Sequence, residues 1–219
     1  MSNKELYPKN QELILRRVEA LSRILSGEEP VRIDNVTIEI EGPDYGWLDI
    51  LFKMEGKFPF IIEASDVYPP FLNLRAWLEH MMDFTSFPSE SFIIDCERYS
   101  VCLSYDYLGH IENENIYEPV ALIQLGHDIP KEEITGDYEP LLQVIVPIRK
   151  FVSDLYNTLK KYMYDNRRVF SRHWSHPNGG DFDIRKLMRS FVSQKVEREI
   201  EQMNKFAGDL GHWPYIRIR

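Results

Sequence analysis

Residues 60–82, which read FIIEASDVYPPFLNLRAWLEHMM, constrain the fold more than any other stretch of this chain. A short apolar run at 60–64 is followed by two prolines and then by apolar residues at helical spacing. Pro69 and Pro70 disfavour a helix before them but suit a first helical turn, whose amide hydrogens have no partner within the helix. We therefore predict a strand at 60–64 and a helix from Phe71 that covers the sheet to which this strand belongs.

The predicted helix has an apolar face wide enough to lie on a sheet. This face consists of Phe71, Leu74, Leu78, Met81 and Met82, with Trp77 beside it. Burial of such a face contributes several kcal/mol, at roughly 25 cal/mol per Å². Arg75 and Glu79 are expected to point away from the sheet.

The segment before this stretch has the pattern of an antiparallel sheet. Residues 31–41 alternate between apolar and polar side chains, which is typical of a strand with one buried and one solvent-exposed face. Residues 42–44 are Gly-Pro-Asp and predict a turn. A second strand is predicted at 47–54 and another turn at 55–57. Together with the strand at 60–64, these elements predict an antiparallel meander.

More strands are predicted in the middle of the chain. The runs at 91–96 and 101–108 read as a hairpin, and the apolar run at 120–125 has the length of a strand. Residues 126–140 are polar and acidic and are predicted to form an exposed loop. Residues 141–146 fit either a strand or the start of a helix.

Three more helices are predicted from apolar residues at helical spacing. They lie at 10–26, from Pro147 onward, and at about 183–204. Either Asp181 or Asp183 can cap the last of these helices.

The order of these elements predicts the fold class. Residues 166–182 carry no regular pattern, and the other segments form blocks of strands and helices that do not alternate strictly. Such blocks favour an α+β fold with a largely antiparallel sheet covered by helices. Because no linker divides the chain, we predict a single domain over residues 1–219.

Composition excludes several classes of function. The formal net charge of −9 argues against nucleic acid as the main ligand. No apolar run approaches the roughly 18 residues of a membrane span. The first residues, MSNKELYPKNQ, lack the apolar core of a signal peptide, and Cys96 and Cys102 are too few for a disulfide framework. We therefore expect a cytoplasmic protein whose cysteines are buried free thiols.

Charge is distributed unevenly along the chain. Residues 104–140 contain nine acidic residues and one lysine, a net charge of −8, whereas residues 147–205 have a net charge of +6. One interpretation is a set of solvated faces that pair with each other. The other is an acidic surface that steers a basic partner.

The acidic segment also carries tyrosines, which are common at protein-binding surfaces. The alternative is that these tyrosines only cover a sheet edge. The candidate partner-binding residues are Tyr105, Tyr107, Glu112, Glu114, Tyr117, Glu118, Glu132 and Glu133.

The residues with catalytic or ligand-binding potential form no recognised motif. His173 and His176 are three apart and could share a metal ion, but no HExxH is present. The chain also lacks a Walker A loop, GxGxxG and GxSxG. The basic run at 167–172, with Trp174, could stack on a nucleic-acid base. We favour instead a basic patch paired with local acidic residues, and we expect no cofactor.

Residues 64–71, ASDVYPPF, with the Trp-Leu-Glu at 77–79, resemble a pattern found in small uncharacterised bacterial proteins. The late segment 151–159, FVSDLYNTL, is similar to a later helix of that group. Some proteins of similar shape are immunity proteins of bacterial toxin systems. No enzymatic activity is assigned to the group that this chain resembles, and the resemblance assigns no functional residue.

Three hypotheses follow. The first is a non-enzymatic, immunity-like binding protein that occludes a protein partner, such as a basic toxin, with its acidic surface. The second is a metal-assisted enzyme with a site near His173 and His176. The third is a structural subunit of a homo-oligomer.

Overall fold

The computed structural model describes residues 19, 22–23, 26, 31–66, 69–83, 89–97, 99–113, 116–128, 141–174, 183–206 and 215–216. In these ranges the elements follow the order β1 (Val31–Arg32), β2 (Thr37–Asp44), β3 (Trp47–Lys53), β4 (Phe60–Ser65), α2 (Phe71–Met81), β5 (Ser89–Asp95), β6 (Ser100–Asn113), β7 (Ile116–Asp128), β8 (Leu141–Pro147), α3 (Ile148–Asp165), α4 (Arg167–His173), α5 (Ile184–Phe191), α6 (Gln194–Phe206) and β9 (Tyr215–Ile216).

The strands form antiparallel sheets, which confirms the predicted α+β class. One sheet has the order β2-β3-β4 and is the predicted meander. A second sheet has the order β5-β6-β7-β8. The short strands β1 and β9 pair with each other. Each connection within the two larger sheets joins sequence neighbours, so local hairpins account for the topology.

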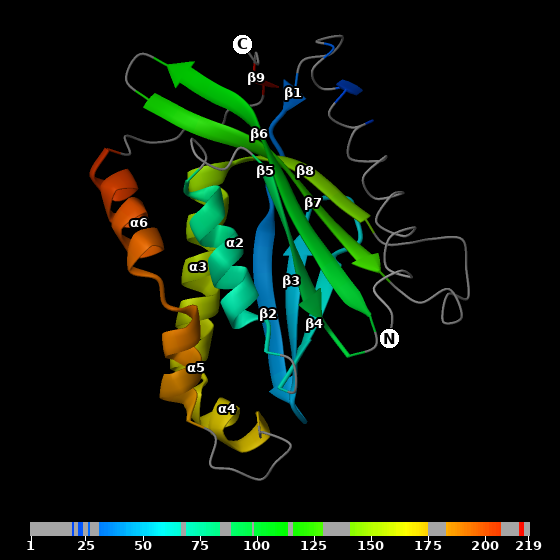
Figure 1. Ribbon diagram of the computed structural model, residues 1–219, viewed down its shortest axis with the longest axis vertical. Helices are drawn as coiled ribbons and strands as arrows, with labels where there is room; N and C mark the ends of the chain where they lie inside the picture. Colours follow the sequence, from blue (N-terminus) through cyan, green and yellow to red (C-terminus); the bar gives the residue numbers. More distant parts are fainter. Residues whose placement is uncertain are drawn as a thin grey trace.

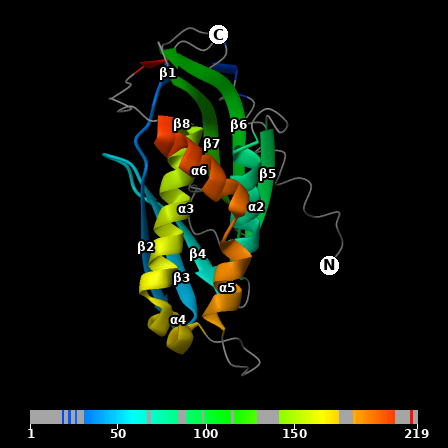
Figure 2. The ribbon, with the colours of Figure 1, turned by 90° about the vertical axis from the view of Figure 1, so that its left-hand side faces the viewer.

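The helices lie together on one side of the strands, as Figures 1 and 2 show for α2, α3, α5 and α6. Helix α2 has the predicted position and buries the predicted face, including Trp77. The Trp77 ring meets Phe151 of α3 edge-on, with ring centroids 6.0 Å apart. Phe151 also stacks on Phe52 of β3 at 6.3 Å. The main hydrophobic core therefore lies where α2 and α3 meet the sheets.

The predicted strand at 31–41 is wrong in its middle. The amide of Asp34 donates to the carbonyl oxygen of Ile145 at 2.7 Å, and Asp34 Oδ2 accepts from the amide of Ile145 at 2.9 Å. These bonds hold Asp34 on β8, between β1 and β2. The predicted turn is also displaced, because β2 continues through Asp44 and the turn residues are Tyr45 and Gly46, both with positive φ.

The segment predicted to be irregular contains the helix α4. Phe170 of α4 is fully buried, with its ring 6.3 Å from Tyr162 and 5.6 Å from Trp174. These tertiary contacts stabilise a helix whose own sequence pattern is weak, since burial of aromatic area can outweigh propensity.

The single helix predicted at 183–204 is two helices. Asp183 caps α5 as expected, accepting from the amide of Arg185 at 2.9 Å. The chain then leaves the helix at Val192, and the hydroxyl of Ser193 accepts from the amide of Val196 at 3.2 Å to cap α6. The Ser193 amide donates to the hydroxyl of Tyr156 at 3.0 Å, so a side chain from α3 holds the break open.

Other predictions are settled only in part. Of the helix predicted at 10–26, Glu19, Ser22 and Arg23 are helical, Ser26 lies in a turn, and the remaining residues lie outside the described part. The ambiguous run at 141–146 is the strand β8. Of the loop predicted at 126–140, the first three residues belong to β7, and 129–140 lie outside the described residues.

In the described ranges, every helix is too short or too polar to cross a membrane.

Candidate functional site

The hairpin formed by β6 and β7 is longer than its neighbours. β5 pairs with β6 up to Asp106, and β8 pairs with β7 from Val120 onward. Among the strands that the structure describes, residues 107–113 of β6 pair only with β7, and residues 116–119 of β7 pair only with β6. We call these residues the arm, and it extends past the four-stranded sheet in Figure 1. A register shift between Tyr107 and Gly109 marks its base.

The arm includes several of the predicted partner-binding residues. The register places Glu112 on β6 opposite Tyr117 on β7. Tyr107, at the base, is half-buried and packs against the main core. Glu114, Glu132 and Glu133 lie outside the described residues. The backbone register of the arm thus places an acidic residue and a tyrosine at opposite positions.

Two of the predicted residues are not surface side chains. Tyr105 is fully buried on the core face of β6. Glu118 on β7 is only 4% exposed. Strand alternation explains the error for Tyr105, because a residue pattern shows which side chains share a face but not which face is covered.

The buried Glu118 connects the arm to helix α3. Its Oε1 accepts from the amide of Arg149 at 3.1 Å, and its Oε2 lies 3.9 Å from the Arg149 guanidinium. The carboxylate therefore caps the helix, whose N-cap Pro147 provides no side-chain cap. Burial raises the pKa of Glu118 to about 7, although the amide and charge of Arg149 act to lower it.

The outer edge of β4 is bonded by side chains from the neighbouring sheet. His127 Nε2 lies 2.8 Å from the carbonyl oxygen of Ile61. The hydroxyl of Tyr99 accepts from the amide of Glu63 at 3.2 Å and donates to Glu63 Oε2 at 3.0 Å. Because these side chains use backbone groups of β4, they oppose the addition of another strand at this edge.

The other outer strands carry similar bonds. Asp34 binds the backbone of β8, as described above. Asn73 of α2 donates to the carbonyl oxygen of Ile93 on β5 at 2.7 Å. Tyr162 of α3 donates its hydroxyl hydrogen to the carbonyl of Gly42 on β2. The arm differs from these strands, because no described strand pairs with either of its outer edges.

The residues around His127 are packed for structure and not for nucleophilic chemistry. The His127 ring lies between Phe60 and Tyr99, with centroid distances of 4.5 and 4.7 Å. Burial raises the pKa of the nearby Cys96 thiol to about 12, so this thiol is protonated at neutral pH. A thiolate is the reactive form of cysteine. Cys96 is therefore a poor nucleophile.

Both cysteines are free thiols, as predicted, with Cys96 buried and Cys102 half-buried. Cys102 lies opposite Ile93 in the hairpin. The register therefore does not pair it with Cys96.

The predicted metal-binding residues are not brought together in the described part of the chain. His173 lies in α4, with its ring edge-on to Tyr45 at 6.3 Å, and His176 falls outside the described residues. Within the described ranges, no three His, Cys, Asp or Glu residues are grouped to hold a metal ion. The metal-assisted enzyme therefore stays a prediction.

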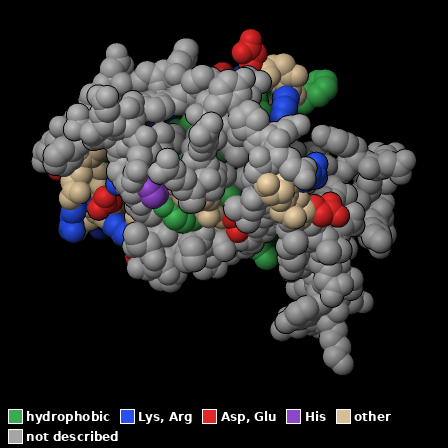
Figure 3. Space-filling model, turned by 90° about the horizontal axis from the view of Figure 1, so that it is seen from above, with side chains coloured by type: hydrophobic (Ala, Val, Ile, Leu, Met, Phe, Trp, Pro, Cys, Tyr) green, Lys and Arg blue, Asp and Glu red, His purple; other side chains and the backbone are tan. Residues whose placement is uncertain are grey.

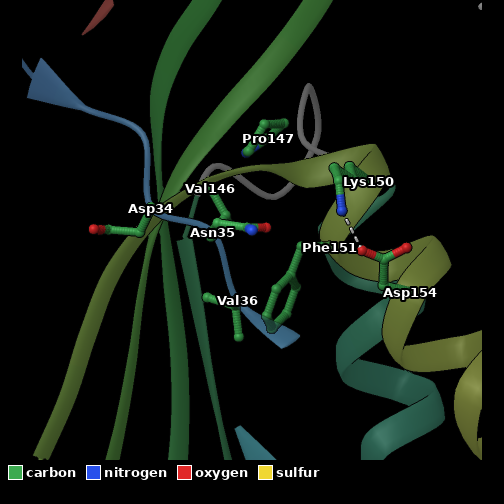
Figure 4. Close-up of a pocket in the computed structure, with 8 residues that line it drawn as sticks. All are labelled: Asp34, Asn35, Val36, Val146, Pro147, Lys150, Phe151 and Asp154. Carbon is green, nitrogen blue, oxygen red and sulfur yellow. Dashed lines mark hydrogen bonds and ion pairs between the residues drawn. The ribbon is translucent and has the colours of Figure 1, made fainter. Parts of the chain in front are cut away.

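A small hollow of about 20 Å³ lies between the β1–β2 connection, the end of β8 and the first turns of α3. Figure 4 shows that Phe151 and Lys150 face it from α3, whereas the Asp34 side chain points away. Lys150 is bonded to Asp154 at 2.5 Å. Pockets for small-molecule ligands usually have about 300–1,000 Å³. This hollow is smaller, and we assign it no substrate.

Figure 3 views the molecule from above, the end toward which the arm extends. The described side chains on this face include acidic, basic and apolar groups, interspersed with one another. Much of the negative charge of residues 104–140 comes from positions outside the described ranges, including Glu114, Glu132 and Glu133.

The sequence pattern places the end of the first strand of this hairpin at residue 108 and the start of the second strand at residue 120. It therefore does not predict the arm. Gly109 and Pro119 weaken a strand pattern, because glycine and proline are typical of strand ends and bulges. Only the pairing of 110–113 with 116–119 shows that the strands continue. Comparison of this chain with protein-family models, with curated proteins and with solved structures found no match.

Proposed function

We propose that this chain is a non-enzymatic protein-binding protein that contacts its partner through the arm. One observation carries the proposal: the arm lacks partner strands on both outer edges within the described residues, whereas the outer strands of the two larger sheets are bonded by side chains. An unpaired strand edge offers backbone donors and acceptors to another chain.

The energetics of a two-stranded hairpin support this proposal. An isolated pair of strands is at best marginally stable in water. The arm is attached to the remainder of the fold at its base, where Leu108 is buried and Glu118 caps α3. A partner strand or surface would supply the contacts that the outer part of the arm does not receive from the described elements.

Charge supports a basic partner. The segment from 104 to 140 has a net charge of −8, and Glu112 lies opposite Tyr117 on the arm. Opposite charge on a partner would speed the encounter and disfavour acidic competitors. Occlusion of a basic protein by such a surface is the mode of action of an immunity-like protein. We further propose a cytoplasmic location, which the two free thiols suit.

The test is capture of a partner from the native host by the immobilised full-length protein, followed by titration calorimetry with the purified partner. We expect the double variant Glu112→Lys with Glu114→Lys to bind at least about tenfold more weakly, since close charge pairs couple strongly.

The matched control reverses two acidic residues away from the arm, Glu55→Lys and Glu199→Lys, and should bind as the wild type does. If both double variants lost affinity for the partner equally, the loss would be due to the change in overall net charge and not to the arm. Unchanged affinity of the arm variant would show that the partner contacts another surface.

A further inference from the structure

Helices α4 and α5 together hold six basic residues and no acidic residue. Four of them, Arg168, Arg172, Arg185 and Lys186, are exposed. In the part of the chain that the structure describes, their side chains form no ion pair or hydrogen bond. The prediction that the basic run pairs with local acidic residues is therefore wrong for Arg168 and Arg172. Trp174 is buried and cannot stack on a ligand. We call α4 and α5 the basic end.

Exposed aromatic rings lie beside the basic end. Tyr45, in the β2–β3 turn, is 87% exposed and contacts the ring of His173 in α4. Tyr164, near the end of α3, is 59% exposed, and the Arg167 guanidinium lies 5.1 Å from the centre of its ring. Tyrosine and arginine are the residue types that are enriched in the energetic centres of protein interfaces.

Three carboxylates form a row on the β2-β3-β4 sheet. The register places Asp49 directly opposite Glu41 on one side and Glu63 on the other. Among the described residues, no lysine or arginine forms an ion pair with any of them. Burial raises the pKa of Asp49, and the charges of Glu63 and Glu41 raise it further. Like charges directly opposite in a sheet are destabilising, so this acidic row carries an uncompensated cost.

The basic end and the acidic row belong to the same end of the molecule. Gly42 follows Glu41, and its carbonyl accepts from Tyr162 near the end of α3. The charge of Glu41 also contributes to raising the pKa of Tyr162. Figure 1 shows the β2–β3 turn and α4 together at the lower end of the molecule.

We propose that this end of the molecule binds a second copy of the chain, with the basic end of each copy against the acidic row of the other. Because both patches belong to the same end of the chain, a two-fold axis at this end would set the basic end of each copy against the acidic row of the other, and two-fold symmetry is the symmetry of most homodimers. Among the described residues, the unpaired groups of each patch have no charged partner, and the second copy supplies one.

Nucleic acid is the main competing occupant of the basic end. Exposed tyrosines and arginines can also bind single strands by stacking and phosphate contacts. The net charge of −9 opposes a long polyanion, whereas a second copy presents only a local acidic row. The charge distribution of the chain therefore favours the dimer.

Sedimentation of the full-length protein tests the dimer at about 0.1 M salt, where screening acts over about 10 Å. We expect the wild type to sediment as a dimer. The basic-reversed variant, Arg168→Glu with Arg172→Glu, should raise the dissociation constant at least about tenfold. The acid-reversed variant, Glu41→Lys with Glu63→Lys, should do the same.

The decisive measurement mixes the two reversed variants. Each contact in the mixed dimer then joins opposite charges, so the mixture should regain the dimer that neither variant forms alone. Because Tyr99 donates to Glu63, the single variant Glu41→Lys provides a second acid-reversed partner that keeps this bond. Thermal melting shows whether each variant is folded.

The control reverses two exposed basic residues away from this end, Lys57→Glu and Arg198→Glu, and should remain dimeric. A monomeric wild type, or folded reversed variants whose mixture stays monomeric, would overturn the proposal. Binding of a fluorescent single-stranded oligonucleotide by a monomeric wild type, lost in the basic-reversed variant, would assign the basic end to nucleic acid instead.

Discussion

Nε2 of His127 on β7 lies 2.8 Å from the carbonyl oxygen of Ile61 on β4, and this bond joins the two larger sheets. A carbonyl oxygen accepts, so Nε2 carries the hydrogen. Burial lowers the pKa of His127, which favours the neutral ring. His127 therefore joins the two sheets through a donated hydrogen bond and through its ring contacts with Phe60 and Tyr99.

Replacement of this residue should weaken the junction. His127→Ala removes the bond to Ile61 and the ring contacts with Phe60 and Tyr99. We expect a loss on the order of 2–3 kcal/mol in the free energy of unfolding, from one buried hydrogen bond and two ring contacts. Urea denaturation measures it. Phe58→Ala, at a side chain that is 97% exposed, should change the same quantity very little.

The break between α5 and α6 depends on the hydroxyl of Tyr156. Tyr156→Phe keeps the ring, which stacks on Phe191 at 5.2 Å, but leaves the amide of buried Ser193 without an acceptor. An unsatisfied buried donor costs about 1–3 kcal/mol, so unfolding should become easier by that amount. Hydrogen exchange at the Ser193 amide should become faster.

Tyr164→Phe is the matched control for Tyr156→Phe, because the Tyr164 ring is exposed. If the two variants had the same denaturation midpoint, the bond to Ser193 would contribute nothing to stability.

Glu118 should make stability depend on pH near neutrality. Its pKa is about 7 in the folded chain against 4.5 for an ordinary glutamate, so folding favours the protonated form. The stability that this group contributes is complete below about pH 4.5 and is lost as the pH rises through 7. Glu118→Gln stays uncharged, so its advantage over the wild type should grow by on the order of 3 kcal/mol between pH 4.5 and pH 8.

The pH series is checked by urea denaturation of Glu118→Gln, of wild type and of Glu55→Gln, whose side chain is exposed. The Glu55 variant should follow the wild type at every pH. A constant difference between Glu118→Gln and wild type across the series would show that Glu118 has an ordinary pKa in the folded chain.

The sequence alone predicts the elements whose signals are local. The two prolines and the apolar spacing after them locate α2, and alternation with turn residues locates the β2-β3-β4 meander and the start of the β5–β6 hairpin. These features depend on side-chain periodicity and backbone sterics, which act over a few residues. The α+β class follows from their order.

The candidate site was only partly predictable. The acidic, tyrosine-bearing segment does contain the arm, with Glu112 and Tyr117 on it. The length of the arm was missed because Gly109 and Pro119 resemble strand ends. The burial of Tyr105 was missed because alternation does not show which face of a strand is covered. The burial of Glu118 was missed because a pattern of acidic residues does not show which of them a helix end will cover.

The tertiary structure decided the features that join distant residues. Asp34 interrupts a strand because it binds Ile145, and Ser193 divides a helix because Tyr156 accepts its amide hydrogen. Phe170 holds α4 in a segment without a helical pattern because the core receives its ring. Each contact links residues far apart in the chain. The sequence determined which local elements this protein can form, and packing determined where they break, pair and remain exposed.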